Sequence, residues 1–254
     1  MVEPSVTARR SAKDRPRLRV VGVITSATDL DFAMRMRSPP DLFELRLDHL
    51  VRMVDELENK LSRLRAPLII TARHSQEGGA NKLSTRQRRD LLSQFLCQAH
   101  YVDVELRSAS ALNPLLKLAR RRKIRRIISF HNLQSTPDPR RLRVKARAAK
   151  AHGADIFKVA TRTDTPVQLV RLLDFITKKD VDLAVSAMGI GKLGAISRVL
   201  LSRAGSVLVY ASLRENDIEG QMSLEQLRAF RIQSQREYFR PCSLVALFSG
   251  RIFY

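Results

Sequence analysis

The segment ADIFKVA (154–160) is a short apolar run interrupted by a single lysine. A run of β-branched and aromatic residues between polar stretches predicts a buried strand. Seven similar runs occur elsewhere: RVVGVIT (19–25), LFELRLD (42–48), PLIITAR (67–73), HYVDVEL (100–106), RRIISF (125–130), VDLAVSA (181–187) and GSVLVYA (205–211). Their starts lie about 27 residues apart, which is too long for hairpins and suits strand-loop-helix-loop units. The sequence therefore predicts eight βα units.

The stretches between these runs carry the apolar spacing of amphipathic helices. The three-and-four spacing joins Leu50, Val54, Leu57, Leu61 and Leu64, and it also joins Leu91, Leu92, Phe95, Leu96 and Ala99. Helix starts are predicted after Ser84, after Thr165 with Pro166, and after Ser223. Eight such units in 254 residues indicate an α/β protein, a single-domain (β/α)8 TIM barrel. A doubly wound open sheet is the less favoured alternative.

The composition is that of a folded protein with an unusual charge. Hydrophobic residues make up 44% and charged residues 28%, which is ordinary, but 46 Lys and Arg against 25 Asp and Glu give a net charge of +21. We expect a basic, flexible N-terminal tail (1–18), one barrel domain (19–230) and a C-terminal extension without an assigned role (231–254).

The same composition excludes several classes of protein. Cys97 and Cys242 are far apart, with no disulfide framework and no zinc-ligand spacing around either. No apolar run approaches the roughly 18 to 20 residues of a membrane span, and the N-terminus lacks the apolar core of a secretion signal. We therefore expect a cytoplasmic protein that does not contact a membrane.

Candidate site residues follow from the barrel itself. Polar side chains at the carboxyl ends of barrel strands point into the active site, whereas the opposite ends contribute to stability. The strand ends and the units that follow them supply Glu44, Arg46, Arg73, Glu77, Glu105, His131, Lys158, Met188, Arg198 and Gln221.

Lys158 carries the strongest signal, because the rest of its strand is apolar. Burial and neighbouring cations both disfavour the ammonium form and leave a free amine that can attack a carbonyl. A lysine that is ion-paired, or that extends to solvent at the strand end, is an alternative of equal weight.

Three further residue types fit acid-base and anion-binding roles. His131 ends its strand, where a histidine can shuttle protons or simply form a structural hydrogen bond. Glu77 begins an EGG loop and could orient a histidine. Arg46, Arg73 and Arg198 could bind a carboxylate through their forked guanidinium groups, although each could equally be structural.

Six motifs together resemble type I 3-dehydroquinate dehydratase in order and spacing. They are ELRLDHL (44–50), TARHSQEGG (71–79), ISFHN (128–132), ADIFKVA (154–160), AMGIGKLGAISR (187–198) and EGQMS (219–223). The combination of a strand-end lysine, a strand-end histidine and the Glu-x-Arg and Arg-x-x-x-Glu pairs is far more specific than any single motif.

The resemblance implies a single barrel, usually a homodimer, that converts 3-dehydroquinate to 3-dehydroshikimate in the shikimate pathway of aromatic amino-acid biosynthesis. The family's Schiff-base lysine matches Lys158, its general acid/base matches His131, and the carboxylate paired with that histidine matches Glu77. Its substrate-binding positions match Glu44, Arg46, Arg73, Met188, Arg198, Asp217 and Gln221.

The implied mechanism is covalent. The amine of Lys158 adds to the substrate ketone, and loss of water leaves an iminium that acidifies the neighbouring carbon. His131 then removes a proton from that carbon and protonates the departing hydroxyl, after which hydrolysis frees the lysine. No cofactor and no metal is expected, because the protonated imine accepts the electrons.

Two departures from the family pattern stand out. The lid loop usually reads Ser-Ala-Pro-Gly-Gln, whereas here it reads Asp217-Ile218-Glu219-Gly220-Gln221. Two added carboxylates should weaken the binding of an anion unless Arg198 or Arg214 neutralises them. The other departure is Asn132, where an aspartate is common after the histidine.

Two other functions compete with this one. The first is a different imine-forming lyase or aldolase with an altered substrate, which the changed lid loop suggests. The second is an inactive basic barrel that binds nucleic acid, which the charge suggests. Aromatic residues at 6%, the lack of Trp and the lack of a recognition motif argue against nucleic acid. We therefore expect a small anionic substrate and a second copy of the chain as the partners.

Overall fold

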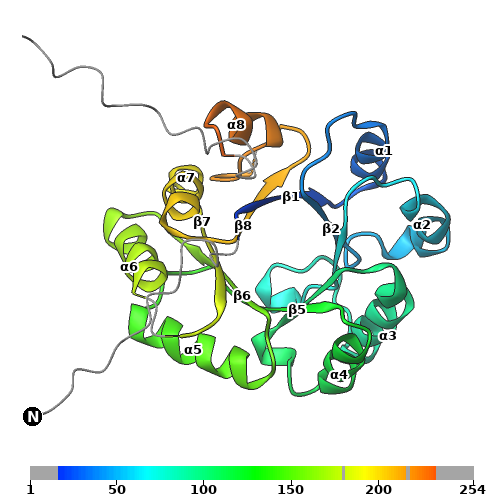
Figure 1. Cartoon of the computed structure of the whole chain (residues 1–254), viewed down its shortest axis with the longest axis horizontal. Coiled ribbons are helices and arrows are strands. Elements are labelled where there is room, and N and C mark those ends of the chain that lie inside the picture. Colours follow the sequence, from blue (N-terminus) through cyan, green and yellow to red (C-terminus); the bar gives the residue numbers. More distant parts are fainter. Residues whose placement is uncertain (1–16, 179–180, 216–217, 233–254) are drawn as a thin grey trace, which may run out of the picture.

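The chain folds as a (β/α)8 barrel, which confirms the predicted architecture (Figure 1). The computed structural model describes residues 17–178, 181–215 and 218–232. The strands are β1 (Arg19–Ile24), β2 (Leu42–Arg46), β3 (Leu68–Thr71), β4 (Tyr101–Glu105), β5 (Arg125–Asn132), β6 (Ile156–Arg162), β7 (Ala184–Ile190) and β8 (Leu208–Ser212). The helices are α1 (Ala27–Arg35), α2 (Val54–Leu61), α3 (Thr85–Phe95), α4 (Asn113–Arg121), α5 (Pro139–Ala151), α6 (Pro166–Thr177), α7 (Gly194–Ala204) and α8 (Leu224–Ala229).

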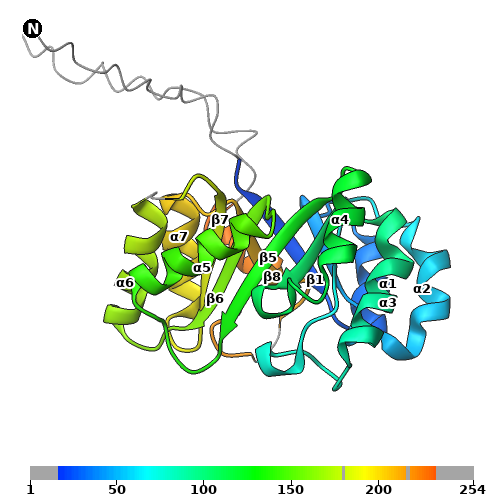
Figure 2. The same ribbon diagram turned by 90° about the horizontal axis from the view of Figure 1, so that it is seen from below.

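The eight strands form one parallel sheet in the order β7-β6-β5-β4-β3-β2-β1-β8. The remaining edges are β7 and β8, and hydrogen bonds join them where β8 begins. Val207 N donates to Val185 O at 2.9 Å, and Ser186 Oγ donates to Leu208 O at 2.9 Å. These bonds close the barrel. Because neighbouring strands are parallel, all strands end on the same side of the molecule (Figure 2). The open-sheet alternative is thereby excluded.

The helix starts lie where capping residues predicted them. Ser84, Thr165 and Ser223 each form a capping box, in which the side chain accepts a hydrogen bond from the third helical residue and a glutamine there bonds back. Each box satisfies two amide groups that a helix leaves unpaired at its start. Pro166 occupies the first turn of α6, where a missing amide hydrogen costs nothing.

Three strands begin two or three residues later than their apolar runs suggested. β8 was expected over 205–211 but starts at Leu208. β6 was expected over 154–160 but starts at Ile156, because the Asp155 carboxylate accepts a hydrogen bond from the Arg126 amide at 2.7 Å before the ladder begins. β7 was expected over 181–187 but starts at Ala184, because Leu183 N bonds back to Val181 O in a turn. β6 and β7 then continue two or three residues further than expected, ending as the pair Arg162 and Ile190.

The apolar core has two layers. A larger cluster packs the helices against the outer faces of the strands, and it includes the fully buried Phe43, Phe95 and Phe157. A smaller cluster fills the barrel interior, with members from every strand, including Val21, Ile69, Tyr101, Ile127, Met188 and Tyr210. Side chains beyond this inner layer, at the carboxyl ends of the strands, are charged.

The predicted tail and extension lie mostly outside the described residues, as does Asp217. Within the described part of the chain, no helix has the length and apolar character needed to cross a membrane.

Candidate active site

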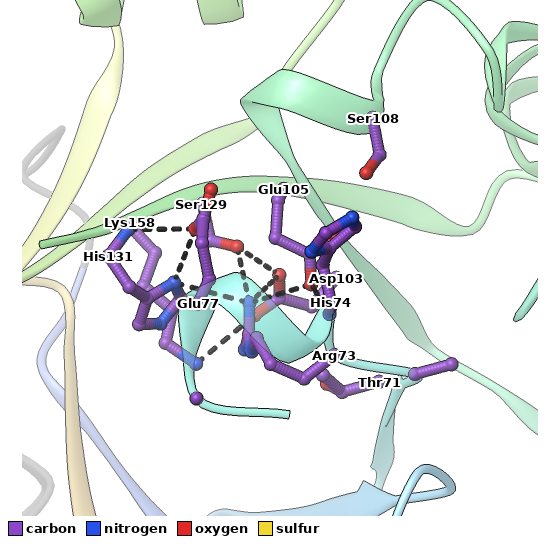
Figure 3. Close-up of polar contacts among 12 residues, drawn as sticks. Thr71, Arg73, His74, Glu77, Asp103, Glu105, Ser108, Ser129, His131 and Lys158 are labelled. Carbon is purple, nitrogen blue, oxygen red and sulfur yellow. Dashed lines mark hydrogen bonds and ion pairs between the residues drawn. The ribbon is translucent and has the colours of Figure 1, made fainter. Parts of the chain in front are cut away.

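Lys158 lies on β6 within a network of polar side chains that includes residues of β4 and β5 (Figure 3). Its Nζ donates to Glu44 Oε1 at 3.1 Å and to Asp103 Oδ2 at 3.1 Å, and it lies 3.8 Å from the centre of the Tyr210 ring. The residue is only 3% exposed. The lysine is thus both buried and ion-paired, and the carboxylates fix its amine at one point of the barrel interior.

Arg73 organises the carboxylates that hold this lysine. Its guanidinium binds Asp103 through two hydrogen bonds of 2.9 and 3.2 Å and donates to Ser129 Oγ at 2.6 Å. Burial lowers the pKa of Arg73, but Asp103 and Glu105 outweigh burial and raise it. Burial likewise raises the pKa of Asp103, yet Arg73 and Lys158 outweigh it and hold that pKa well below its usual range. Both groups remain charged through the neutral range.

His131 and Glu77 form a hydrogen-bonded pair beside the lysine. His131 Nδ1 lies 3.0 Å from Glu77 Oε2, and the same oxygen accepts from the His131 amide at 2.9 Å. Burial, with help from Arg73 and Lys158, holds the pKa of His131 well below its usual value. Burial also raises the pKa of Glu77 to about 7. At neutral pH the imidazole is therefore neutral, and it can accept a proton at Nε2 when Glu77 is ionised and accepts the Nδ1 proton.

Arg46 shapes the loop that carries Glu77. Its guanidinium binds Asp48 through two hydrogen bonds of 2.9 and 2.8 Å and donates to Gly78 O at 3.2 Å. Asp48 in turn accepts from the Ala80 amide at 2.9 Å. Gly78 has φ +83, a backbone conformation that favours glycine. Together these contacts hold the turn that directs Glu77 toward His131.

Arg198 is a buried cation without a carboxylate partner among the described residues. Its Nη1 donates to the carbonyl oxygens of Gly189, Gly194 and Gly220 at 3.0, 3.0 and 2.6 Å, and its Nε donates to Tyr210 O at 3.1 Å. Burial lowers its pKa to about 10, so the guanidinium stays charged at neutral pH. A buried positive charge held only by carbonyls favours an anionic ligand.

The remaining predicted residues take different places. Met188 is buried on β7 opposite Ala160 in the inner cluster, and Gln221 lies in the β8–α8 loop with its amide bonded to Ile218 O at 3.0 Å. Glu105 is bound by the fully buried Arg88 and by the His74 amide, and its Oε1 lies 3.4 Å from Arg73 Nη1, so it links α3 to the network around Arg73.

The charge of Glu219 is neutralised, but by a residue that sequence reasoning did not name. Arg162 Nη2 lies 3.2 Å from Glu219 Oε2, while Arg162 Nε binds Asp164 at 2.6 Å. Arg214 instead lies 3.4 Å from Asp29, and Arg198 makes no ion pair with Glu219. Neither Arg198 nor Arg214, the two possible partners named from the sequence, pairs with Glu219, and Asp217 lies outside the described residues.

Sequence reasoning also missed Asp103, Ser129 and Tyr210. All three are buried inside the barrel and contact Lys158 or Arg73. A signal was present in YVDVE (101–105), where Asp103 and Glu105 alternate with apolar residues. Alternation of that kind puts both carboxylates on one face of a strand.

Comparison with known proteins identifies the family. A model of the type I 3-dehydroquinase family matches residues 21–236. The chain belongs to the type I 3-dehydroquinase family. It is 34% identical over 195 residues to a 3-dehydroquinate dehydratase of Pyrococcus abyssi, an alignment covering 75% of this chain and 86% of the relative. A 3-dehydroquinate dehydratase of Shouchella clausii is 31% identical over 204 residues, covering 75% of this chain and 79% of the relative.

Solved structures of this type I 3-dehydroquinase family agree with the fold. The 3-dehydroquinate dehydratase of Aquifex aeolicus superposes with a TM-score of 0.72 at 25% identity, covering 87% of this chain and 99% of that one. The enzyme from Geobacillus kaustophilus gives a TM-score of 0.76 at 24% identity, covering 84% of this chain and 89% of that one. The barrel of this chain is therefore the barrel of the type I 3-dehydroquinases.

Proposed function

We propose that this protein is a 3-dehydroquinate dehydratase that works through an imine on Lys158. The observation that carries the proposal is the pairing of a buried lysine with a buried neutral histidine at one end of a barrel of this family. The reaction eliminates water from 3-dehydroquinate to give 3-dehydroshikimate, in the shikimate pathway of aromatic amino-acid biosynthesis. Imine chemistry of this kind needs no metal or cofactor in the site.

Substrate binding follows from the charges. Arg198 binds the substrate carboxylate, which supplies a counter-ion that no described residue provides to its buried guanidinium, and Gln221 assists from the β8–α8 loop. Glu44 and Arg46 offer hydrogen-bonding groups to the ring hydroxyls. Met188 forms an apolar side of the site. Arg73 acts on the substrate through other residues, because its Nη1 and Nη2 groups are already bound to Asp103 and Ser129.

The chemistry requires two proton movements at His131. The ammonium of Lys158 gives up two protons in all, and both end on the ketone oxygen. The freed amine adds to the ketone carbon, that oxygen leaves as water, and the protonated imine remains on Nζ. His131 Nε2 then takes the proton next to the iminium carbon, which gives an enamine. The enamine electrons expel the hydroxyl group as His131 returns the proton to it, and water finally hydrolyses the imine. Glu77 holds Nδ1 throughout, so that Nε2 remains the reacting nitrogen.

Borohydride reduction tests this proposal directly. Reduction in the presence of 3-dehydroquinate should add the mass of the dehydrated ligand to the peptide that contains Lys158, and Lys158→Met should show no adduct. His131→Ala should still form the adduct slowly while turnover falls by about two to four orders of magnitude. Failure to trap any adduct under turnover conditions, or near-normal turnover of His131→Ala, would contradict the mechanism.

We further propose that the protein is a cytoplasmic homodimer. Support for a dimer comes from the outer faces of α6 and α7, where Val167, Val170 and Ile196 are at least half exposed. These adjacent helices present few cations, whereas a dimer through α4 or α5 would bring like charges together. Sedimentation equilibrium should give the mass of two chains for the wild type and of one chain for Val170→Lys.

A further inference from the structure

The barrel has a cavity at the end opposite the proposed active site. It has a volume of about 280 Å³ and lies where the strands begin, at the upper end of the barrel in Figure 2. Its lining residues are Arg17, Arg19, Arg125, Asp155, Ile156, Ala184, Val207 and Leu208. Five strands or their leading residues, from β1, β5, β6, β7 and β8, therefore surround it.

The charge of this cavity is positive and unbalanced. Arg17, Arg19 and Arg125 have no carboxylate partner within residues 17–178, 181–215 and 218–232. The one acidic lining residue, Asp155, already binds Arg126 through contacts of 2.7, 3.1 and 3.2 Å. Three guanidinium groups thus face one cavity without a counter-ion from the described residues.

Tyr101 fixes two of these guanidinium groups. Its ring, from the start of β4, lies 5.5 Å from Arg19 Cζ and 5.9 Å from Arg125 Cζ. Arg125 Nη1 also donates to Tyr101 Oη at 3.3 Å. Tyr101 is buried, so its ring is a rigid support on which both arginines stack. The site is therefore partly ordered before any ligand arrives, which lowers the entropy cost of binding.

The rest of the cavity wall limits the size and chemistry of a ligand. Ile156, Ala184, Val207 and Leu208 supply an apolar floor, and Val21, Ile69 and Ile127 of the inner cluster lie between this end and Lys158. Two or three guanidinium groups bind carboxylate or phosphate oxygens through paired hydrogen bonds. A small ligand with at least two negative charges would balance most of the positive charge.

We propose that the amino-terminal mouth of the barrel is a binding site for a small oxyanion with two or more negative charges, either a phosphate compound or a dicarboxylate. This site is separate from the one that holds Lys158 and does not depend on the proposed dehydratase activity. It also gives a role to Arg17, Arg19 and Arg125, which belong to the excess of basic residues and take no part in the proposed active site.

Isothermal titration of the full-length protein at low ionic strength tests the site. Inorganic pyrophosphate and succinate are the two probes. Tighter binding of pyrophosphate indicates a phosphate ligand, and tighter binding of succinate indicates a dicarboxylate. Arg125→Gln and Arg19→Gln should each weaken binding of the tighter probe by about tenfold, because each removes a charge-assisted pair of hydrogen bonds. Borohydride labelling of Lys158 by 3-dehydroquinate and kcat/KM should stay unchanged in both variants.

Two control variants distinguish binding at this site from attraction of the anion by the overall positive charge and from binding in the active site. Arg121→Gln removes an equal charge from exposed α4, outside the cavity lining, and should leave probe affinity within about twofold of the wild type. Arg198→Gln should also leave it unchanged. The proposal is overturned if neither probe binds, if Arg121→Gln weakens binding as much as Arg125→Gln, or if only Arg198→Gln abolishes it.

Discussion

The Glu77 carboxyl is the group most sensitive to pH near neutrality. Burial raises its pKa to about 7, while burial of His131 keeps the imidazole neutral over the same range. Only the ionised carboxylate can accept the Nδ1 proton and leave Nε2 free as a base. When Glu77 is protonated it donates to Nδ1 instead, and the proton of the imidazole moves to the reacting nitrogen.

We therefore predict that kcat falls as the pH drops below about 7, by up to tenfold per unit, because the ionised form of Glu77 is the active one. Glu77→Gln should have a lower kcat and should lose this titration step. Glu56→Gln removes an exposed carboxylate on α2 and serves as the control, with an unchanged profile. A wild-type kcat that is constant from about pH 5.5 to 8 would contradict the role of Glu77.

The residues of the site differ in how far the sequence predicts them. Lys158 stands out because a charged group in an apolar strand needs a reason to be there, and His131 because it ends a strand, whereas Arg198 could equally have been structural. Tyr210 does not stand out, and the alternation of YVDVE gives Asp103 a face but no partner, because both residues become important only when the fold brings β4 and β8 to Lys158. The pair of Arg162 and Glu219 is 57 residues apart in the chain and could not be paired without the fold.

At the scale of elements, the β8–α8 loop is attached to the end of β6 and to α7. Glu219 binds Arg162, and the carbonyl of the next residue, Gly220, accepts from Arg198 at 2.6 Å. Gly220 has φ +75, and an added Cβ there would meet the backbone of Gly191. The loop is thus held close to the cation that we assign to substrate binding, and Arg162 acts through the loop as a positioning residue.

We predict that Glu219→Arg and Arg162→Glu each raise KM for 3-dehydroquinate by about two- to fivefold with a smaller change in kcat, because exposed ion pairs contribute up to about 1 kcal/mol. The double variant Arg162→Glu/Glu219→Arg restores the pair and the net charge, and it should regain most of the affinity. A double variant no better than the worse single variant would show that the ion pair does not position the loop.

At the scale of the whole molecule, the barrel follows from repetition. Each βα unit has one buried run and one amphipathic helix, so the architecture was predictable even where strand ends were not. The late start of β6 comes from Asp155, whose hydrogen bond to the Arg126 amide depends on the assembled fold, and the late start of β7 comes from a local turn in which Leu183 N bonds to Val181 O. Turn geometry of this kind leaves little trace in a hydrophobic pattern.

The net charge is unevenly distributed over this barrel. Residues 106–154, which include α4, β5 and α5, hold 14 Lys and Arg and a single Asp. Arg121 and Arg122 are exposed at the end of α4 and have no ion-pair partner in the described part of the chain. Close like charges raise the free energy of the compact state, because unfolding separates them. Salt weakens this repulsion, since the screening length falls from about 30 Å at 0.01 M to about 10 Å at 0.1 M.

We predict that the free energy of unfolding, measured by urea denaturation, rises as NaCl increases from about 0.01 to 0.2 M. Arg121→Gln/Arg122→Gln should stabilise the protein at low salt and flatten this response, because it removes two unpaired cations from the densest cluster. Arg86→Gln/Arg89→Gln removes the same charge from α3, where both arginines lie beside Asp90, at 3.8 and 3.2 Å. That matched variant loses the attraction to Asp90 as well as repulsion between arginines, so it should raise the free energy of unfolding less than Arg121→Gln/Arg122→Gln does. A wild type whose stability falls with added salt would show that attractive pairs, rather than the arginine cluster, dominate the electrostatics of the fold.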